Sequence, residues 1–257
     1  MAWCSPSAVS TSEADMDLGQ NYTSDPIVTV PLEQGRLLDV GSLNRLPPIA
    51  VTPAHHESAI ALIPARNEEG RVASVVRAAL GASLVSQTVV VANACSDETA
   101  REAEVEGAVV LETSHPGKGE ALLAGVQACS PATRFFIFLD ADLRELRSNH
   151  VDDLLRPVIA GDSQMACGIL PSPQPYGRLL QSLVRRHPSL TLTGQRAIDR
   201  GVLEDLDSVD ASGYQIEVAL NSLCKKTDRS VMVLCLDGVH TLRERTKLAY
   251  LTGACRR

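Results

Sequence analysis

Nearly all residues of one short run near the middle of the chain, RFFIFL at residues 134–139, are apolar, and the run contains all three phenylalanines of the protein. Such a run indicates a strand that is buried on both faces, as in the centre of a parallel sheet. It ends in Asp140-Ala141-Asp142, so two carboxylates directly follow the carboxyl end of the predicted strand.

Strand-like and helix-like segments alternate at short spacing from Ser58 onward. Between the apolar runs, apolar residues recur at i, i+3, i+4 and i+7, as in Val72–Leu80, which predicts amphipathic helices. The alternation is typical of βαβ units and predicts an α/β fold with a mostly parallel sheet flanked by helices. Further strands are expected at Ala59–Ile63, Gln87–Ala92, Ala108–Leu111, Gln164–Leu170 and Ser230–Leu236.

Residues 1–57 are rich in Ser, Thr and Pro and show weak periodicity, which predicts an irregular, loosely ordered N-terminal extension. Two β-prone pieces within it, Ile27–Val30 and Leu37–Val40, could pair with the main domain. That single domain is expected to span residues 58–257.

Composition narrows the class of protein. With 257 residues, 44% of them hydrophobic and 21% charged, the chain suits one well-packed globular domain. A net charge of −7 and an aromatic content of 3% argue against a nucleic-acid-binding or membrane-surface role. Seven scattered cysteines without a CxxC pair are typical of buried thiols in a reducing compartment.

The sequence also predicts where the protein resides. The N-terminus lacks the basic and apolar regions of a signal peptide, and no apolar run reaches the ~18 residues of a membrane span. We therefore expect a cytoplasmic protein without stable membrane association, for which a homodimer is compatible with the sequence.

Polar side chains follow three of the predicted strands, at Arg66–Glu69, Asn93–Asp97 and Asp140–Asp142. Because parallel strands end at the same edge of a sheet, these clusters can form one site. Carboxylates suit Mg²⁺ or Mn²⁺, although the acidic pair alone is equally well explained as a solvated turn. Lys118, between two glycines at a helix start, suits a phosphate, although in isolation a solvated turn residue is the simpler interpretation.

Seven motifs, in order, resemble those of a family 2-type glycosyltransferase of the GT-A (Rossmann-like) fold. More narrowly, they are similar to the small bacterial branch that includes glucosyl-3-phosphoglycerate synthase. The motifs are ALIPARNEEGRVASVV, VVANACSDETA, HPGKGEALLAG, FLDADL, TGQRAI, GYQIEVALN and LDGVHTLRERTK. The resemblance runs from about Ala59 to Lys247, and it implies a nucleotide-sugar-binding half at 58–143 and an acceptor-binding half at 144–257.

The resemblance implies a role for each motif. The residues that would bind the nucleotide sugar are Pro64, Ala65, Arg66, Asn67, Glu68, Asn93, Lys118, Asp140, Ala141 and Asp142. Asp142 would bind the metal directly, with His240 and Asp140 completing its site. The acceptor side would be lined by Thr193, Gly194, Gln195 and Arg196. Glu217 would be the catalytic carboxylate, with Asp210 behind it. Without the family pattern, His240 and Glu217 are more simply solvated surface residues.

The expected activity is metal-dependent transfer of a hexosyl or N-acetylhexosaminyl group from a nucleotide sugar, with UDP as the expected nucleotide, to the hydroxyl of a small soluble acceptor. Mn²⁺ or Mg²⁺ would stabilise the leaving diphosphate, and Glu217 would accept the proton of the hydroxyl. Inversion and retention both remain open.

Two departures from the family pattern bear on specificity. Asn93 stands where the pattern has an acidic residue, which leaves the choice of base open. The Pro171–Pro188 region is shorter than in the phosphoglycerate enzymes and lacks their Gly-Arg-rich phosphate pocket, which argues for another small acceptor.

Two alternative functions remain. A nucleotide-sugar-binding protein without catalysis would keep Asp142 and His240 but lack a working base. A sugar-nucleotide nucleotidyltransferase would require an early G-x-G-T-R-x-x-P loop, which the IPARNEE segment does not match.

Overall fold

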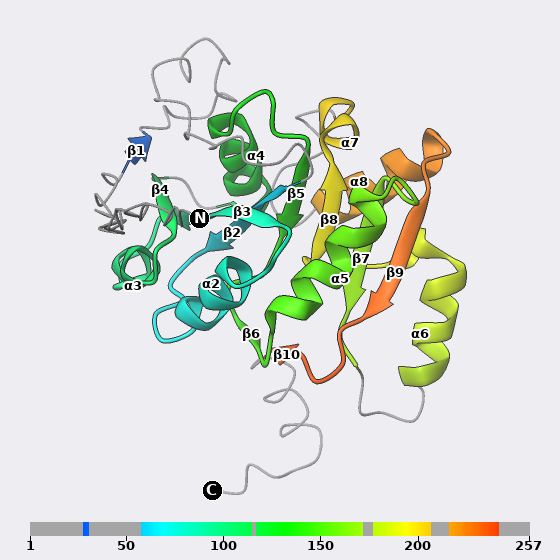
Figure 1. Ribbon diagram of the computed structural model, residues 1–257, viewed down its shortest axis with the longest axis horizontal. Coiled ribbons are helices and arrows are strands. Elements are labelled where there is room, and N and C mark those ends of the chain that lie inside the picture. The colour runs from blue at the N-terminus through cyan, green and yellow to red at the C-terminus, as the bar shows by residue number, and fades with distance from the viewer. Residues whose placement is uncertain (1–27, 31–57, 115–116, 172–176, 207–215, 242–257) are drawn as a thin grey trace, which may run out of the picture.

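The computed structural model describes residues 28–30, 58–114, 117–171, 177–206 and 216–241 (Figure 1). Within these ranges eight strands form one sheet in the order β1-β4-β3-β2-β5-β8-β7-β9. The strands are β1 (Val28–Val30), β2 (Ala59–Ala65), β3 (Val85–Asn93), β4 (Val109–Thr113), β5 (Phe135–Phe138), β7 (Met165–Ile169), β8 (Arg196–Asp199) and β9 (Val231–Cys235).

Helices cover both faces of this sheet. They are α2 (Val72–Leu80), α3 (Thr99–Val105), α4 (Lys118–Ala128), α5 (Ser148–Ile159), α6 (Gly177–Arg186), α7 (Arg200–Glu204) and α8 (Ile216–Lys226), with a short 3-10 helix η1 (Pro188–Leu190). Buried residues of α2, α3 and α5 pack on one face, and those of α4, α7 and α8 on the other. The predicted α/β fold with a mostly parallel sheet flanked by helices is confirmed.

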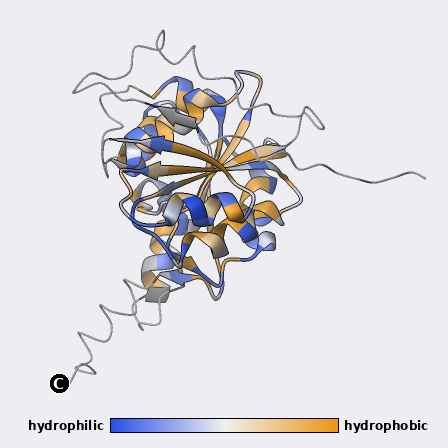
Figure 2. Cartoon of the chain, turned by 90° about the vertical axis from the view of Figure 1, so that its left-hand side faces the viewer, coloured by the Kyte–Doolittle hydropathy of each residue, from blue (hydrophilic) through white to orange (hydrophobic). Residues whose placement is uncertain are grey.

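The strand β5 is the centre of the hydrophobic core, as its sequence predicts. Phe135 and Ile137 contribute to the cluster under α2 and α5, whereas Phe136 and Phe138 contribute to the cluster under α4 and α8. This division follows from the twofold side-chain period of a strand, which sends alternate residues to opposite faces. Figure 2 shows apolar residues concentrated along the strands of the sheet.

The directions of the strands determine which strand ends lie together at one edge of the sheet. β4, β3, β2 and β5 are parallel to one another, so their carboxyl ends lie at one edge. β8 is antiparallel to both β5 and β7, and β9 is again parallel to β7. The antiparallel strand β8 begins opposite Phe138, so it brings the residues before it to the carboxyl edge of β5.

One short strand extends the main sheet, and two others form a separate ribbon. The strand expected near residues 27–30 is present as β1, which pairs in parallel with β4; the other expected piece, Leu37–Val40, lies outside the described residues. A separate antiparallel ribbon joins β6 (Leu143–Arg144) to β10 (His240–Thr241), with His240 opposite Arg144. This ribbon has no counterpart in the sequence-based prediction.

Buried thiols are also present as expected. Cys129, Cys167 and Cys224 are free and buried, and burial raises the pKa of Cys129 to about 12. Across the described ranges, every helix is too short or too polar to span a membrane.

Candidate active site

The loops after β2 and β3 are neighbours at the carboxyl edge of the sheet. Pro64 and Ala65 lie within β2 itself, where they pair with Val91 and Ala92, and Asn93 is the last residue of β3. Both strands are followed by a residue with positive φ, Asn67 at 54° and Ala94 at 49°. Such conformations are uncommon in non-glycine residues and cluster at functional sites.

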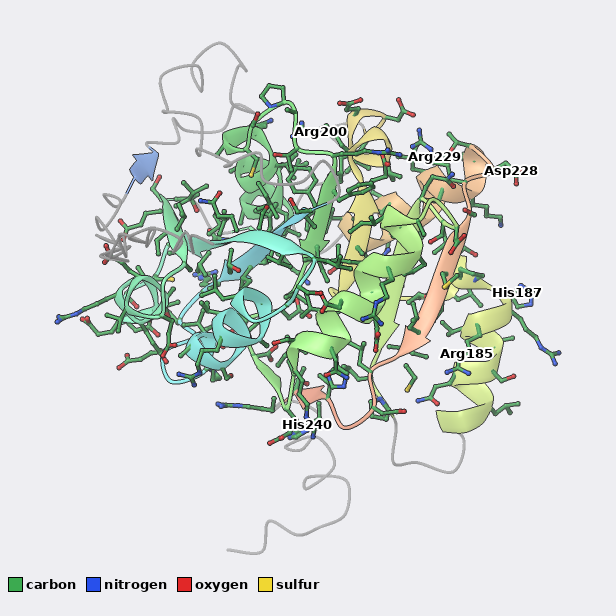
Figure 3. All side chains as sticks on the ribbon, in the orientation of Figure 1. Arg185, His187, Arg200, Asp228, Arg229 and His240 are labelled. Carbon is green, nitrogen blue, oxygen red and sulfur yellow. The ribbon has the colours of Figure 1, made fainter. Side chains whose placement is uncertain are left out.

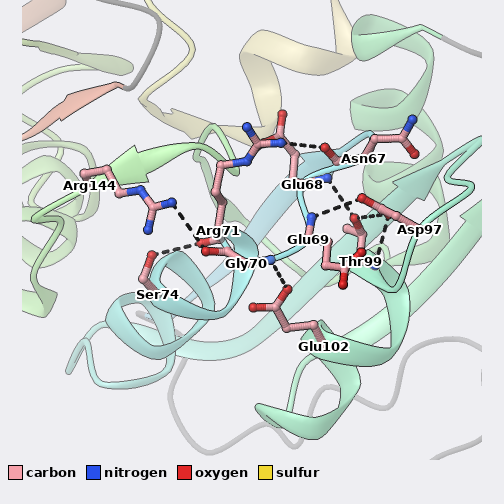
Figure 4. Close-up of polar contacts among 10 residues, drawn as sticks. All are labelled: Asn67, Glu68, Glu69, Gly70, Arg71, Ser74, Asp97, Thr99, Glu102 and Arg144. Carbon is pink, nitrogen blue, oxygen red and sulfur yellow. Dashed lines mark hydrogen bonds and ion pairs between the residues drawn. The ribbon is translucent and has the colours of Figure 1, made fainter. Parts of the chain in front are cut away.

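The β2–α2 loop is held from below by side chains of the β3–α3 segment (Figure 4). Three successive backbone N–H groups of the loop donate to these side chains: Glu68 to Thr99 Oγ1 at 2.8 Å, Glu69 to Asp97 Oδ2 at 3.2 Å and Gly70 to Glu102 Oε2 at 2.7 Å. In the other direction, the backbone N–H of Ser96 donates to Asn67 Oδ1 at 2.9 Å. The two loops therefore form one hydrogen-bonded unit.

Asp97 and Thr99 are the centre of this unit. Thr99 is fully buried, and its hydroxyl donates to Asp97 while accepting from Glu68. Burial of Asp97 opposes its ionisation, but hydrogen bonds from Thr99 and from the backbone of Glu69 outweigh this and hold the pKa of Asp97 below its ordinary value. Nothing local in the sequence indicates this role of Thr99, because its partner Glu68 lies 31 positions away.

Charged groups of the loop are paired with one another. Arg71 Nε lies 2.6 Å from Glu68 Oε2, and Nη2 of the same arginine donates to the Asn67 carbonyl at 2.6 Å. Arg144 of β6 donates to the Gly70 carbonyl at 3.3 Å, which joins the loop to the β6–β10 ribbon. Arg66, also predicted to bind the nucleotide, is exposed at the start of this loop.

Asn93 connects the end of β3 to the turn that carries Lys118. Its Nδ2 donates to the Gly117 carbonyl at 2.7 Å, and its Oδ1 accepts from Thr113 Oγ1 at 3.2 Å. Asn93 is buried, so its amide fixes the start of α4 relative to β3 and β4. An amide can both donate and accept in this way, which a carboxylate cannot.

Lys118 lies between two carboxylates. Its Nζ is 2.7 Å from Asp140 Oδ1 and 2.7 Å from Glu217 Oε1. The second oxygen of Asp140 accepts from Gln195 Nε2 at 2.7 Å. Desolvation by burial disfavours the ammonium, but the two carboxylates outweigh it and raise the pKa of Lys118. The start of α4, the turn after β5, the first turn of α8 and the segment before β8 thus meet at one cation.

Gly194 is required at this meeting point for steric reasons. A Cβ atom built on it would overlap the Asp140 carboxylate and Lys118 Nζ. The predicted acceptor residues Thr193, Gly194 and Gln195 therefore lie against the Asp140 side chain, with Thr193 Oγ1 donating to the Gly168 carbonyl at 2.6 Å.

Arg196 is turned into the interior of the protein. It is 1% exposed, and its three guanidinium nitrogens donate to the Thr193 carbonyl at 2.8 Å, to Asn221 Oδ1 at 2.7 Å and to the Thr191 carbonyl at 2.8 Å. The guanidinium therefore shapes the 191–196 segment from beneath. Arg196, predicted to line the acceptor side, therefore contacts that segment through the Thr193 carbonyl.

The β6–β10 ribbon places His240 opposite Arg144, close in sequence to Asp142. Asp142 is half-buried, two residues before Arg144, and Arg144 pairs with His240. His240 Nδ1 lies 3.2 Å from the Gly238 carbonyl, which suits a tautomer with the proton on Nδ1 and a lone pair on Nε2. A carboxylate and such an imidazole are chemically suited to Mn²⁺ or Mg²⁺.

The described residues do not form a complete metal cage. Within these ranges, no group of three or more His, Cys, Asp and Glu side chains is arranged to hold an ion. Asp140 is instead engaged by Lys118 and Gln195. Asp210, predicted to support Glu217, lies outside the described residues.

Comparison with known proteins identifies the family. The sequence model of glycosyl transferase family 2 matches residues 60–204, which is more than half of the chain. The chain belongs to this family. The resemblance predicted from the seven motifs is thereby confirmed.

Individual relatives of this family 2 glycosyltransferase are distant. This chain is 33% identical over 108 residues to the 4,4'-diaponeurosporenoate glycosyltransferase of Staphylococcus aureus (strain bovine RF122 / ET3-1). The match covers 39% of this chain and 28% of the relative. The chain thus spans little more than a quarter of the length of that curated relative.

Solved structures share the fold over most of the chain. Glucosyl-3-phosphoglycerate synthase from Mycobacterium tuberculosis, in complex with Mn²⁺, UDP-glucose and phosphoglyceric acid, is 24% identical, with a TM-score of 0.61 over 90% of this chain and 88% of that one. The complex with Mg²⁺ and UDP is 24% identical, with a TM-score of 0.59 over 89% and 86% of the two chains. The GT-A fold expected of this family 2 glycosyltransferase is confirmed.

The substitution Thr99→Val tests the unit that holds the β2–α2 loop. Valine has nearly the same shape but leaves the Glu68 N–H without its acceptor, so we expect a loss of about 1–3 kcal/mol in the free energy of unfolding and faster exchange of the Glu68 amide hydrogen. Urea denaturation and hydrogen-exchange NMR measure the two effects. Thr99→Ser keeps the hydroxyl and should preserve the protection of that amide. Unchanged protection in Thr99→Val would show that the hydroxyl does not hold the loop.

The raised pKa of Lys118 predicts how its stabilisation depends on pH. The contribution of the ammonium is fully present below its ordinary pKa of 10.5 and is lost as the pH rises through the raised value. Lys118→Met should therefore reduce the free energy of unfolding more at about pH 7 than at about pH 12, as measured by urea denaturation. The exposed Lys226→Met serves as the control for general alkaline effects. An equal deficit for Lys118→Met at both pH values would contradict the ion-pair interpretation.

Proposed function

We propose that this family 2 glycosyltransferase transfers a sugar from a nucleoside-diphosphate sugar, with UDP as the nucleotide, to the hydroxyl of a small soluble acceptor. The observation that carries the proposal is the meeting of Lys118, Asp140 and Glu217 at the carboxyl ends of the parallel strands. In α/β folds this edge is where ligands bind. A cation and two carboxylates there supply groups for leaving-group stabilisation and for proton transfer.

The donor would lie over the loops after β2, β3 and β5. Pro64–Glu68 and Asn93 would contact the nucleoside, and Ala141 with its flanking aspartates would face the diphosphate. Support comes from the solved relatives, which were crystallised with UDP or UDP-glucose and with Mn²⁺ or Mg²⁺. A divalent cation on Asp142 and His240, with Asp140 beside it, would neutralise charge on the departing diphosphate.

Lys118 would add a second positive charge at the same place. An ammonium has three N–H donors, so Lys118 can keep both carboxylate partners and still donate to a phosphate oxygen. Because its pKa is raised, the side chain remains charged throughout the neutral range. It would therefore stabilise the leaving group without itself transferring a proton.

Glu217 would act on the acceptor. Its Oε1 is fixed by Lys118, and Thr193–Gln195 lie on the other side of Asp140, so an acceptor hydroxyl bound against this segment would be near the carboxylate. Glu217 would accept the hydroxyl proton as the sugar is displaced. Asp210 would assist from behind.

The donor site is tested by calorimetric titration of UDP. We expect binding that requires Mn²⁺ or Mg²⁺ and that becomes at least about tenfold weaker in Asp142→Asn, because that substitution removes a charged ligand of the metal. Asp162→Asn, which alters an exposed carboxylate at the end of α5, is the matched control. Absence of UDP binding to the wild type in the presence of either metal would refute the proposed donor site.

The catalytic role is tested with Glu217→Gln. The substitution keeps the shape of the side chain but removes its basicity, so transfer from UDP-sugars should fall by roughly 10²–10⁴-fold while UDP affinity is retained. Product formation by mass spectrometry across a panel of UDP-sugars and hydroxylated acceptors measures transfer, with exposed Glu204→Gln as the control. If the wild type binds UDP but turns over no donor, a nucleotide-sugar-binding protein without catalysis is the better description. Full transfer by Glu217→Gln would exclude this residue as the base.

A further inference from the structure

A cavity lies near the start of β9, at the end of the sheet opposite the candidate active site. It has a volume of about 220 Å³, and the side chains that matter for its chemistry are Arg186, His187, Lys225, Arg229, Asn221 and Cys224. Arg229 immediately precedes β9, whereas His240 follows the other end of that strand, and Figure 3 shows these two residues at opposite ends. The cavity is therefore separate from the candidate active site.

Basic side chains dominate the lining. Arg186 and His187 come from the end of α6, Lys225 from the last turn of α8, and Arg229 from the turn before β9. Among the described residues, no Asp or Glu lines this cavity. This concentration of positive charge contrasts with the net charge of −7 for the whole chain, and it creates a local field that attracts anions.

Arg229 has donor groups that the described part of the chain satisfies only in part. One nitrogen of its guanidinium, Nη2, is paired with Asp205. The other, Nη1, is buried and makes no hydrogen bond within the described part of the chain. A buried N–H group without an acceptor is unfavourable, and a guanidinium presents its donors in a fork that matches an oxyanion.

The size of the cavity limits what can fill it. At about 220 Å³ it is smaller than the ~300–1,000 Å³ of pockets for drug-sized ligands. It nevertheless exceeds several times the ~30 Å³ that one water molecule occupies. A single tetrahedral oxyanion with a few waters, or the phosphate end of a small molecule, fits this range.

We propose that this cavity is a binding site for a phosphate-type oxyanion, supplied either as free phosphate or as the phosphate group of a small metabolite. Arg229, Lys225, Arg186 and His187 would surround its oxygens. The proposal does not depend on the proposed transferase activity.

Asn221 connects this cavity to the acceptor side of the candidate active site. Its Nδ2 donates to the Ser189 carbonyl at 3.2 Å and to the Thr191 carbonyl at 2.7 Å, and its Oδ1 accepts from Arg196. Arg196 in turn holds the Thr193 carbonyl. An anion that orders the cavity wall therefore also restrains the 191–196 segment, which slows hydrogen exchange there.

Two neighbouring lysines allow a matched test. Lys225 lines the cavity and Lys226 does not, although both are exposed at the end of α8. We expect calorimetric titration with inorganic phosphate, in phosphate-free buffer without metal, to show binding that is about tenfold weaker in Lys225→Gln and unchanged in Lys226→Gln. In the wild type, added phosphate should also slow the exchange of the 193–195 amide hydrogens. This slowing should be lost in Lys225→Gln and kept in Lys226→Gln.

Lys118→Met distinguishes this cavity from the candidate active site. Phosphate affinity should be the same in this variant as in the wild type. If Lys118→Met removes binding while Lys225→Gln retains it, or if the wild type binds no phosphate, the proposal is overturned. Titration with glycerol 3-phosphate separates the two sources of the anion, since tighter binding than that of inorganic phosphate identifies a phosphorylated metabolite, and equal or weaker binding identifies free phosphate.

Discussion

One ammonium group joins the parts of the chain that form the candidate active site. Lys118 is within 2.7 Å of carboxylates from the turn after β5 and from the first turn of α8. Two neighbouring carboxylates repel each other. The cation between them is therefore what allows α8 to pack with Glu217 near Asp140. Gly194 leaves room for this arrangement, because a side chain there would overlap the Asp140 carboxylate and Lys118 Nζ.

The sheet beneath this cluster supplies rigidity, and the loops above it are fixed by side chains instead of by regular pairing. Thr99, Asp97 and Glu102 hold three consecutive amides after β2, and Asn93 holds the carbonyl before α4. These contacts compensate for the left-handed backbone conformations that follow β2 and β3. The loops of the proposed donor side are thereby preorganised, which reduces the entropy lost when a ligand binds.

Local patterns in the sequence were sufficient for most of the fold. The apolar run of β5, the alternation of strands and helices, and the polar residues after each strand depend on short-range periodicity, which is why they were predictable. The β6–β10 ribbon was not, because strands of two residues have no period to detect. Nor was the interior orientation of Arg196, since an arginine is usually exposed and its partners Thr191 and Asn221 are brought near by tertiary packing.

The ribbon also has a consequence for how the protein is made. During synthesis, residues 143–144 emerge about a hundred positions before their partners at 240–241, and folding proceeds from the N-terminus. A nascent chain can thus assemble β2, β3, β4 and β5 while the acidic turn still lacks its histidine. On the proposed function, the nucleotide side would take shape first, and the histidine proposed to hold a metal ion would join it only after about a hundred further residues had been synthesised.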